Sequence, residues 1–119
     1  MLSALIVCAA LSVVDGDTIK CDGQNMRLLG EGVVNVRGID TPELRTWKCQ
    51  KERKLAKLAR NRLKELLKGE RPKIVAKGVD AFGRPLVNVY VDGQELGKQL
   101  LREGFAREWR KGKKIDWCR

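Results

Sequence analysis

A long amphipathic helix is predicted for Lys51–Lys68, and it limits how the short segments on either side of it can pack. Apolar residues in this stretch repeat at helical spacing, while most other positions are Lys, Arg or Glu. Gly69 follows directly and is typical of a helix C-terminus. The face expected to turn toward the core consists of Leu55, Leu58, Ala59, Leu63, Leu66 and Leu67.

The segments before this helix are short apolar runs that end in turn residues, which is typical of strands. Asp22-Gly23 is a strong hairpin signal between two of them. Gly30-Glu31-Gly32 interrupts the next run and indicates a loop or a bulge. The runs are Leu5–Val14, Thr18–Cys21, and a third that starts at Met26–Leu29 and resumes at Val33–Ile39.

After the helix, Pro72–Lys77 and Leu86–Val91 predict two more strands, and Glu95–Glu103 predicts a second, shorter helix. A chain of 119 residues is expected to form one domain, here residues 11–119. Five short strands with two helices indicate a mainly β fold with α (α+β). We predict a five-stranded OB-fold barrel with two to three packed helices, a frequent carrier of nucleic-acid binding.

The composition favours an anionic partner. The formal net charge is +10 and the pI is near 9.8, so nucleic acid is the simplest candidate, although a merely soluble basic protein would look the same. Histidine is absent, which removes the commonest general base and the commonest zinc ligand. Hydrolytic chemistry would therefore need carboxylates, a metal on oxygen ligands, lysine or cysteine.

The four cysteines lack a C-x-x-C pair, so a zinc cluster is not expected. Two disulfides or four ordinary thiols remain open, and a bridge from Cys118 would attach the tail to the segment that carries Cys49. The tail from Arg107 to Arg119 is basic, with Trp109 and Trp117 as candidate anchors.

The first ten residues form a short apolar run that ends in Ala9-Ala10. The run is either a signal-like segment or a buried first strand, and it is too short to span a bilayer. We expect a secreted or periplasmic protein, with a cytoplasmic one as the alternative, and no membrane association once the protein is mature.

Two acidic segments carry the candidate chemistry. Asp15-Gly16-Asp17-Thr18 forms a turn after an apolar run, and Gly16 permits that turn to be tight. In Ile39-Asp40-Thr41-Pro42-Glu43 the proline stiffens the loop that presents two carboxylates. We predict that the two segments meet in space and hold a hard cation, since carboxylates with backbone carbonyls suit calcium or magnesium.

Cleavage of a phosphodiester requires an activated water and neutralisation of the phosphoryl oxygens. Asp17 and Asp40 are candidate ligands, and Glu43 is the candidate base. The arginines available to clamp a phosphate are Arg27, Arg37 and Arg84. Most of these residues also have a structural explanation: Asp15 and Asp17 as turn formers, Asp40 as a cap of its own loop, Glu43 as a helix cap, and Arg84 as a surface arginine in a turn.

Four blocks in order resemble the signature of the staphylococcal nuclease-like (thermonuclease) family. The resemblance extends from about Val13 to Ala106, and the ordered set is more specific than any single block. The blocks are Val13-Val14-Asp15-Gly16-Asp17-Thr18-Ile19, Arg27-Leu28-Leu29-Gly30, Gly38-Ile39-Asp40-Thr41-Pro42-Glu43 and Asp80-Ala81-Phe82-Gly83-Arg84-Pro85-Leu86.

The resemblance implies a five-stranded OB barrel with helices and a calcium-dependent phosphodiesterase. Such enzymes cut DNA and RNA with little sequence preference and leave 5′-hydroxyl and 3′-phosphate ends. Matched by motif, Asp17 and Asp40 would bind calcium through their carboxylates and Thr41 through its backbone carbonyl. Glu43 would be the general base, and Arg84 a phosphate clamp. We expect a monomer.

The sequence departs from the family pattern in three places. Glu31 to Gly38 is inserted between two blocks, so the catalytic arginine is Arg27 when counted forward from Asp17, and Arg37 is the nearest basic residue when counted back from Asp40. We favour Arg27. Phe82 stands where a tyrosine is often seen, so a hydroxyl contact to the substrate would be absent. The loop between Glu43 and the helix is also short.

The sequence leaves two alternative functions open. An OB module that binds nucleic acid without cutting it is favoured by the displaced arginine register and disfavoured by the retained carboxylates. The other hypothesis is a small interaction domain that recruits an acidic protein through its basic surface. No motif favours it.

Overall fold

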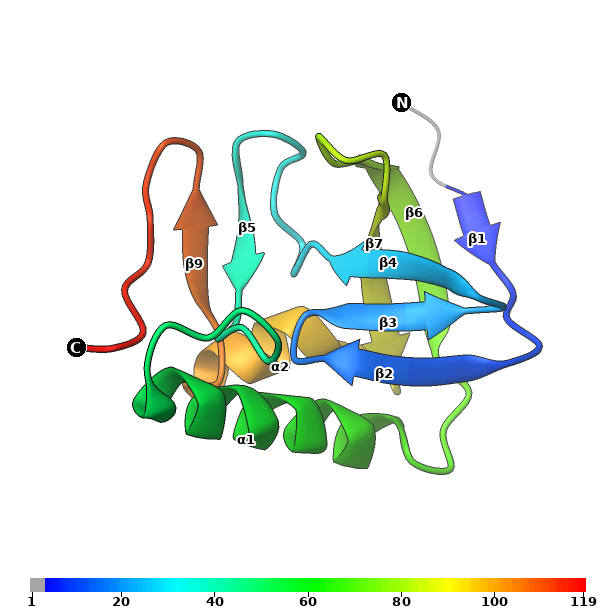
Figure 1. Ribbon diagram of the computed structural model, residues 1–119. Coiled ribbons are helices and arrows are strands. Elements are labelled where there is room, and N and C mark those ends of the chain that lie inside the picture. The colour runs from blue at the N-terminus through cyan, green and yellow to red at the C-terminus, as the bar shows by residue number, and fades with distance from the viewer. Residues whose placement is uncertain (1–3) are drawn as a thin grey trace.

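The computed structural model describes residues 4–119 and shows a mixed α+β fold, mainly sheet with two helices in the described range (Figure 1). The predicted α+β class is confirmed. The strands are β1 (Ala4–Ile6), β2 (Leu11–Asp15), β3 (Thr18–Cys21), β4 (Gln24–Leu28), β5 (Arg37–Asp40), β6 (Lys73–Val79), β7 (Pro85–Val91), β8 (Gln94–Glu95) and β9 (Arg107–Arg110), and the helices are α1 (Gln50–Leu67) and α2 (Leu96–Arg102).

Seven of the strands form one sheet with the order β1-β6-β7-β4-β3-β2 and with β8 beside β7. The pairs are antiparallel except for β4 with β7, which run parallel. β5 and β9 form a separate two-stranded sheet. Within residues 4–119 no ladder joins the edge strands β1 and β2, so the sheet is open there and the closed five-stranded barrel is not confirmed.

The predicted single strand Leu5–Val14 is wrong, because the chain divides into β1 and β2 on opposite edges of the sheet. The physical reason lies in the neighbouring Asp22-Gly23 turn. The Asp22 carboxylate accepts hydrogen bonds from the backbone N–H groups of Ala9 at 3.2 Å and Ala10 at 2.7 Å. These bonds take the backbone at Ala9 and Ala10 out of a ladder, and the chain bends between β1 and β2.

The inserted segment does not continue as the strand predicted for Val33–Ile39. The chain turns at residues 34–36, and β5 begins only at Arg37. Val33 pairs with Arg37 in an isolated bridge across this turn. Asn35 at its tip has φ of +63°, a left-handed conformation that Asn tolerates better than most residues.

Helix α1 covers one side of the sheet and contacts β2 (Figure 1). Its buried residues are Glu52, Ala56, Ala59 and Leu63, so small side chains let the helix approach closely. Leu58 is 54% exposed, and its predicted place in the core was wrong. The apolar stripe is therefore rotated toward the alanines, which bring α1 close to the turn between β2 and β3.

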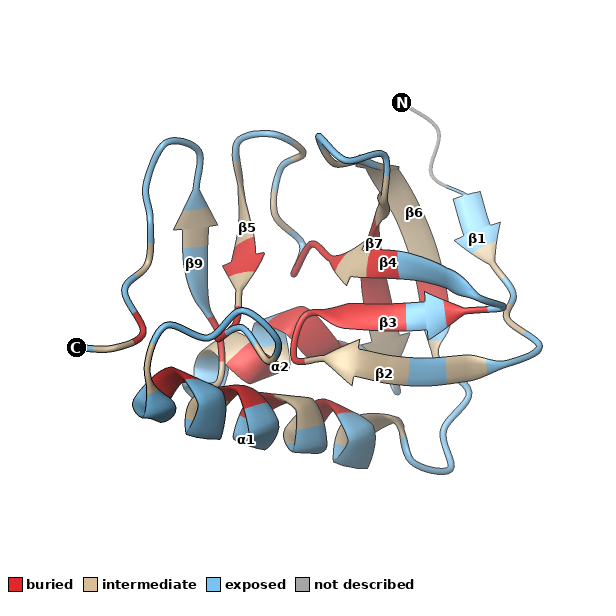
Figure 2. Cartoon of the chain, in the orientation of Figure 1, coloured by how far each residue is buried: buried red, intermediate tan, exposed pale blue. Residues whose placement is uncertain are grey.

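The core lies between the sheet and the two helices, where the buried segments of Figure 2 meet. Burial of each large aliphatic side chain contributes about 1.5–3 kcal/mol relative to exposure. Helix α2 supplies Leu96 and Leu100 as predicted. The largest fully buried apolar side chains include Ile19, Leu28, Leu63, Ile74, Val87, Val89 and Leu100.

The C-terminal tail is more ordered than the sequence suggested. Its first residues form β9, which pairs antiparallel with β5. Two disulfides connect Cys8 with Cys21 and Cys49 with Cys118, so the structure carries the bridged alternative for all four cysteines. The second bridge attaches the end of the tail to the start of α1, which is one of the alternatives that the sequence left open.

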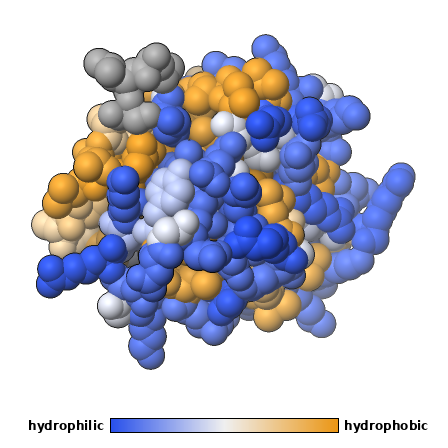
Figure 3. Space-filling view, turned by 180° about the vertical axis from the view of Figure 1, so that it is seen from behind, coloured by the Kyte–Doolittle hydropathy of each residue, from blue (hydrophilic) through white to orange (hydrophobic). Residues whose placement is uncertain are grey.

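The surface is largely hydrophilic, with separate apolar clusters on the face seen from behind in Figure 3. Large exposed apolar side chains lie in and beside β1 and β6, namely Leu5, Val7 and Val79. In the described part of the chain, no helix has both the length and the apolar character needed to cross a bilayer.

Candidate active site

The two acidic segments lie against each other, and a glycine makes the approach possible. Gly16 is buried in the turn between β2 and β3. A Cβ at this position would be 3.0 Å from Thr41 Oγ1 and 2.7 Å from Ala59 Cβ. A larger residue would therefore push the Asp15–Asp17 turn away from the Asp40–Glu43 loop and from α1.

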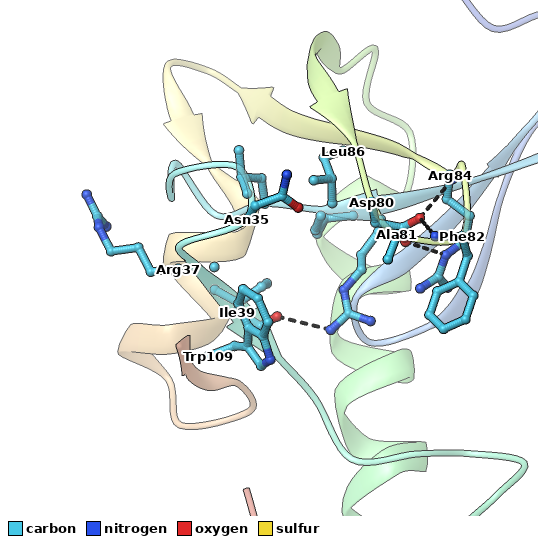
Figure 4. A pocket seen from close by; sticks show the side chains of 13 residues that line it. Asn35, Arg37, Ile39, Asp80, Ala81, Phe82, Arg84, Leu86 and Trp109 are labelled. Carbon is cyan, nitrogen blue, oxygen red and sulfur yellow. Dashed lines mark hydrogen bonds and ion pairs between the residues drawn. The ribbon is translucent and has the colours of Figure 1, made fainter. Parts of the chain in front are cut away.

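Arg27, on β4, lies between the two predicted ligand carboxylates. Its Nη2 atom is 3.3 Å from Asp17 Oδ2 and 3.3 Å from Asp40 Oδ1. The same atom donates a long hydrogen bond of 3.4 Å to the Ile39 carbonyl oxygen, which Figure 4 draws as a dashed line. One guanidinium nitrogen thus joins carboxylates from segments 23 positions apart in the chain, Asp17 and Asp40.

The carboxylates around Arg27 are crowded and partly removed from water. Burial, followed by the charge of Asp17, raises the pKa of Asp15 to about 7. Burial and Asp17 also raise the pKa of Asp40, against the hydrogen bonds from Trp117 and Arg27. Both carboxyl groups are therefore harder to ionise than exposed ones, and a cation bound beside them would favour their charged forms.

The oxygen atoms at this site are of the type that binds a hard cation. Two buried oxygen atoms at the site, Asp15 Oδ1 and Thr41 Oγ1, have no hydrogen-bond partner. Carboxylate and hydroxyl oxygens are the ligand type that calcium and magnesium prefer. Among residues 4–119, however, no group of three or more acidic or Cys side chains is arranged to hold a metal. Asp17 and Asp40 would have to share their oxygens with Arg27 or release it.

Glu43 is exposed and lies near Asp17 and Asp40. Burial of part of the carboxyl and the charges of Asp17 and Asp40 raise its pKa, while Arg27 opposes them. A higher pKa makes Glu43 a stronger proton acceptor than an ordinary surface glutamate.

A buried glutamate holds the loop that carries Glu43, and sequence reasoning missed it. Glu52, in the first turn of α1, is 4% exposed. Its carboxylate accepts from the backbone N–H groups of Glu43 at 3.0 Å and Lys48 at 2.8 Å. Its own N–H points to the Sγ of Cys49, the N-cap residue, at 3.4 Å. Cys49 and Glu52 have the three-residue spacing of a capping box, but a cysteine stands where that motif has Ser or Thr, and the bonds to Glu43 and Lys48 come from the fold.

A pocket of about 250 Å³ lies next to the carboxylates, and Arg27 and Arg84 both line it. Figure 4 shows Arg84, Asp80 and Phe82 together on one side of this pocket and Trp109 and Ile39 on another. The other lining residues are Leu28, Leu29, Asn35, Arg37, Gly38, Ala81 and Leu86.

The turn between β6 and β7 holds Arg84 in a defined position. Asp80 accepts from the Arg84 backbone N–H at 2.9 Å and from its Nε at 2.7 Å. The guanidinium carbon lies 5.7 Å from the centre of the Phe82 ring, and Phe82 itself is 86% exposed. An arginine and an exposed aromatic ring at the mouth of one pocket suit a phosphate and a stacked base.

Arg37 lies apart from the carboxylates. It begins β5, its register partner on β9 is Arg110, and in Figure 4 its side chain points away from Arg84. Of the two arginines considered from the sequence, Arg27 is the one that contacts Asp17 and Asp40. The inserted segment instead packs its turn on the sheet, with Val34 close to Gly78 of β6.

A tryptophan from the far end of the chain also reaches the site. Trp117 is 6% exposed, and its indole Nε1 donates to Asp40 Oδ2 at 3.1 Å. The sequence indicated Trp117 only as a candidate anchor. Asp40 and Trp117 are 77 positions apart, and no local pattern predicts a contact over that separation.

The comparison with known families agrees with the resemblance in the motifs. The sequence profile of the family described as "Staphylococcal nuclease homologue" matches residues 33–116, which is most of the chain. Asp40, Thr41, Glu43 and Arg84 lie inside the match, whereas Asp17 and Arg27 precede it and are brought to the site by the fold. A search of curated proteins found no match.

Proposed function

Because the chain belongs to the staphylococcal nuclease homologue family, we propose that it is a calcium-dependent phosphodiesterase. The proposed substrates are DNA and RNA, cut with little sequence preference to leave 5′-hydroxyl and 3′-phosphate ends. The observation that carries the proposal is the convergence of Asp17 and Asp40 on Arg27, beside Glu43 and at the edge of a pocket that Arg84 also lines.

In the proposed reaction, Glu43 removes a proton from water, whose oxygen attacks the phosphorus. The bond from phosphorus to the 5′ oxygen breaks and this oxygen takes a proton from solvent water, so a 5′-hydroxyl leaves and the phosphate stays on the 3′ side. Arg27 and Arg84 balance the charge that develops on the phosphoryl oxygens, since guanidinium groups pair well with phosphate. The raised pKa of Glu43 supports its role as a base closer to neutral pH.

Asp17, Asp40 and the backbone carbonyl of Thr41 are the groups proposed to hold calcium. A bound calcium ion would supply further neutralisation of the phosphate charge. The unpaired oxygens of Asp15 and Thr41 support a cation in this corner.

The pocket and the overall charge support a nucleic-acid strand as the substrate. The pocket of about 250 Å³ has an apolar lining with arginines on it, which suits a base and its phosphates. The excess of 25 Lys and Arg over 15 Asp and Glu favours a polyanion over a neutral ester. Phe82 is proposed to stack on a base.

A plasmid and an RNA transcript incubated with calcium, magnesium or chelator test this proposal. We expect digestion of both with calcium and none with chelator, and near-complete loss in Glu43→Gln with an unchanged circular dichroism spectrum. Fragments that T4 polynucleotide kinase phosphorylates without prior phosphatase treatment would carry the proposed 5′-hydroxyl, and fragments that need that treatment would contradict it. Equal digestion in chelator would count against calcium dependence.

A nucleic-acid-binding module without catalysis is the second candidate, and two observations favour it. Arg27 bonds to both proposed ligand carboxylates, and the described residues offer no prearranged three-carboxylate site. This candidate predicts binding that weakens steeply with salt and no cleavage with any divalent ion. Fluorescence anisotropy with a labelled oligonucleotide, run beside the digestion assay, separates the two.

We also propose an OB-type barrel whose first strand is broken into β1 and β2, since these consecutive strands form the two edges of the sheet. The two disulfides support an oxidising location, secreted or periplasmic. The proposed state is a monomer, which light scattering would test.

A further inference from the structure

The C-terminal tail is attached to the start of α1 at two points. After β9 the chain turns and runs back toward the start of α1 (Figure 1). Cys118 is bonded to Cys49, and Lys51 donates from Nζ to the backbone carbonyl oxygen of Arg119. Trp117 lies between β9 and these attachments. It is buried, with 6% of its surface exposed.

The indole of Trp117 is held on both its face and its edge. The guanidinium carbon of Arg107 lies 4.6 Å from the ring centre, and Arg107 is the register partner of Asp40 across β5 and β9. The indole N–H donates to Asp40 Oδ2. The ring therefore has little freedom to rotate away from the carboxylate.

Both oxygens of Asp40 consequently have a fixed donor. Arg27 contacts Oδ1 at 3.3 Å, and Trp117 bonds Oδ2 at 3.1 Å. An indole N–H can donate but not accept, so the bond favours the ionised carboxylate and leaves further lone pairs on the oxygens for a cation. Groups that orient a metal-binding carboxylate in this way are part of how a site selects its geometry.

We propose that Trp117 is a positioning residue for Asp40, delivered to it by the Cys49–Cys118 disulfide, and that it sets the affinity of the site for calcium. This inference rests on the proposed function, because it requires Asp40 to be a calcium ligand. Loss of such an orienting group typically costs about 10–100-fold in metal affinity.

The test compares calcium binding by isothermal titration calorimetry in the wild type and in Trp117→Phe. Phenylalanine retains an aromatic face for Arg107 but has no N–H. Trp47→Phe is the matched control, since Trp47 is 38% exposed and stacks with Arg53 instead of bonding to the site. All titrations are made well below the melting temperature of each variant, as measured by circular dichroism.

We expect the dissociation constant for calcium to rise at least tenfold in Trp117→Phe and less than twofold in Trp47→Phe. In the digestion assay, the calcium concentration for half-maximal rate should rise by a similar factor, and excess calcium should restore most of the rate. A merely structural role would lower the rate at every calcium concentration without this shift.

The double variant Cys49→Ser/Cys118→Ala releases the tail without altering the indole and keeps a side-chain acceptor at the helix cap, so it carries the test if Trp117→Phe does not fold. It should also weaken calcium binding at least tenfold. Wild-type calcium affinity in Trp117→Phe, or in the folded double variant, would overturn the inference and leave the proposed function intact. A wild-type protein that neither binds calcium nor cleaves nucleic acid would overturn both.

Discussion

Removal of the Cys49–Cys118 disulfide should be among the most destabilising single changes to this protein. The bridge joins residues 69 positions apart, whereas Cys8–Cys21 joins residues 13 apart. Constraint of the unfolded chain by loops of these lengths gives about 4 kcal/mol for the longer loop and about 3 kcal/mol for the shorter. Since small domains are stable by about 5–15 kcal/mol, either loss is a large fraction of the total.

The measurement is urea unfolding of three proteins followed by tryptophan fluorescence and circular dichroism. Cys49→Ser/Cys118→Ala, in which serine keeps a side-chain acceptor at the N-cap of α1, is compared with the wild type and with Cys8→Ala/Cys21→Ala as the control. We expect the longer-loop variant to lose more free energy of unfolding and to show a larger m-value, because its unfolded state is less compact. A loss below about 1 kcal/mol, or a smaller loss than in the control pair, would refute the loop-length argument.

Three further predictions address the site and its surroundings. Glu52→Gln retains only one acceptor oxygen for the two backbone N–H groups it bonds, so we expect about 1–3 kcal/mol lower stability in urea unfolding and slower digestion. Gly16→Ala should cost about 1–3 kcal/mol through the clash at 2.7 Å, and Ala59→Gly in the same chain should recover part of it; equal stability of both variants to the wild type would argue against close contact. The hydrogen bonds of Arg62 lower the pKa of Glu103 from 4.5 to about 2, so its contribution is complete above pH 4.5 and is lost as the pH falls toward 2. Melting temperatures of Glu103→Gln and the wild type should therefore differ at pH 6 and converge near pH 2.

The inserted segment explains why counting along the sequence did not settle which arginine lies beside Asp17 and Asp40. The insertion at 31–38 makes the distance from Asp17 and the distance from Asp40 point to different residues. In the structure the insertion forms its own turn and leaves β4 in place beside β3, which keeps Arg27 between the two carboxylates. Arg37 is carried instead to the far side of the pocket, opposite Arg110.

The contacts of the C-terminal tail could not be predicted from any local pattern in the sequence. Residues 107–119 look like a basic tail, because neither helical spacing nor strand alternation is present. β9 pairs with β5, and Trp117 is buried next to Cys118, which the disulfide to Cys49 holds beside α1. Nothing local to the tail predicts either contact.

Features set by near neighbours were readable directly from the residues. The long helix, the Asp22-Gly23 hairpin, the second helix and the stiff Asp40–Glu43 loop all depend on spacing, turn chemistry and proline, which act over a few positions. The family followed from the order of the motifs. Contacts between distant segments were decided only by packing: the split of the first strand by Asp22, the disulfide pairing, the place of Arg27, and the bond from Trp117 to Asp40. Such contacts depend on which surfaces meet once the core has formed, and no short pattern in a single chain records that.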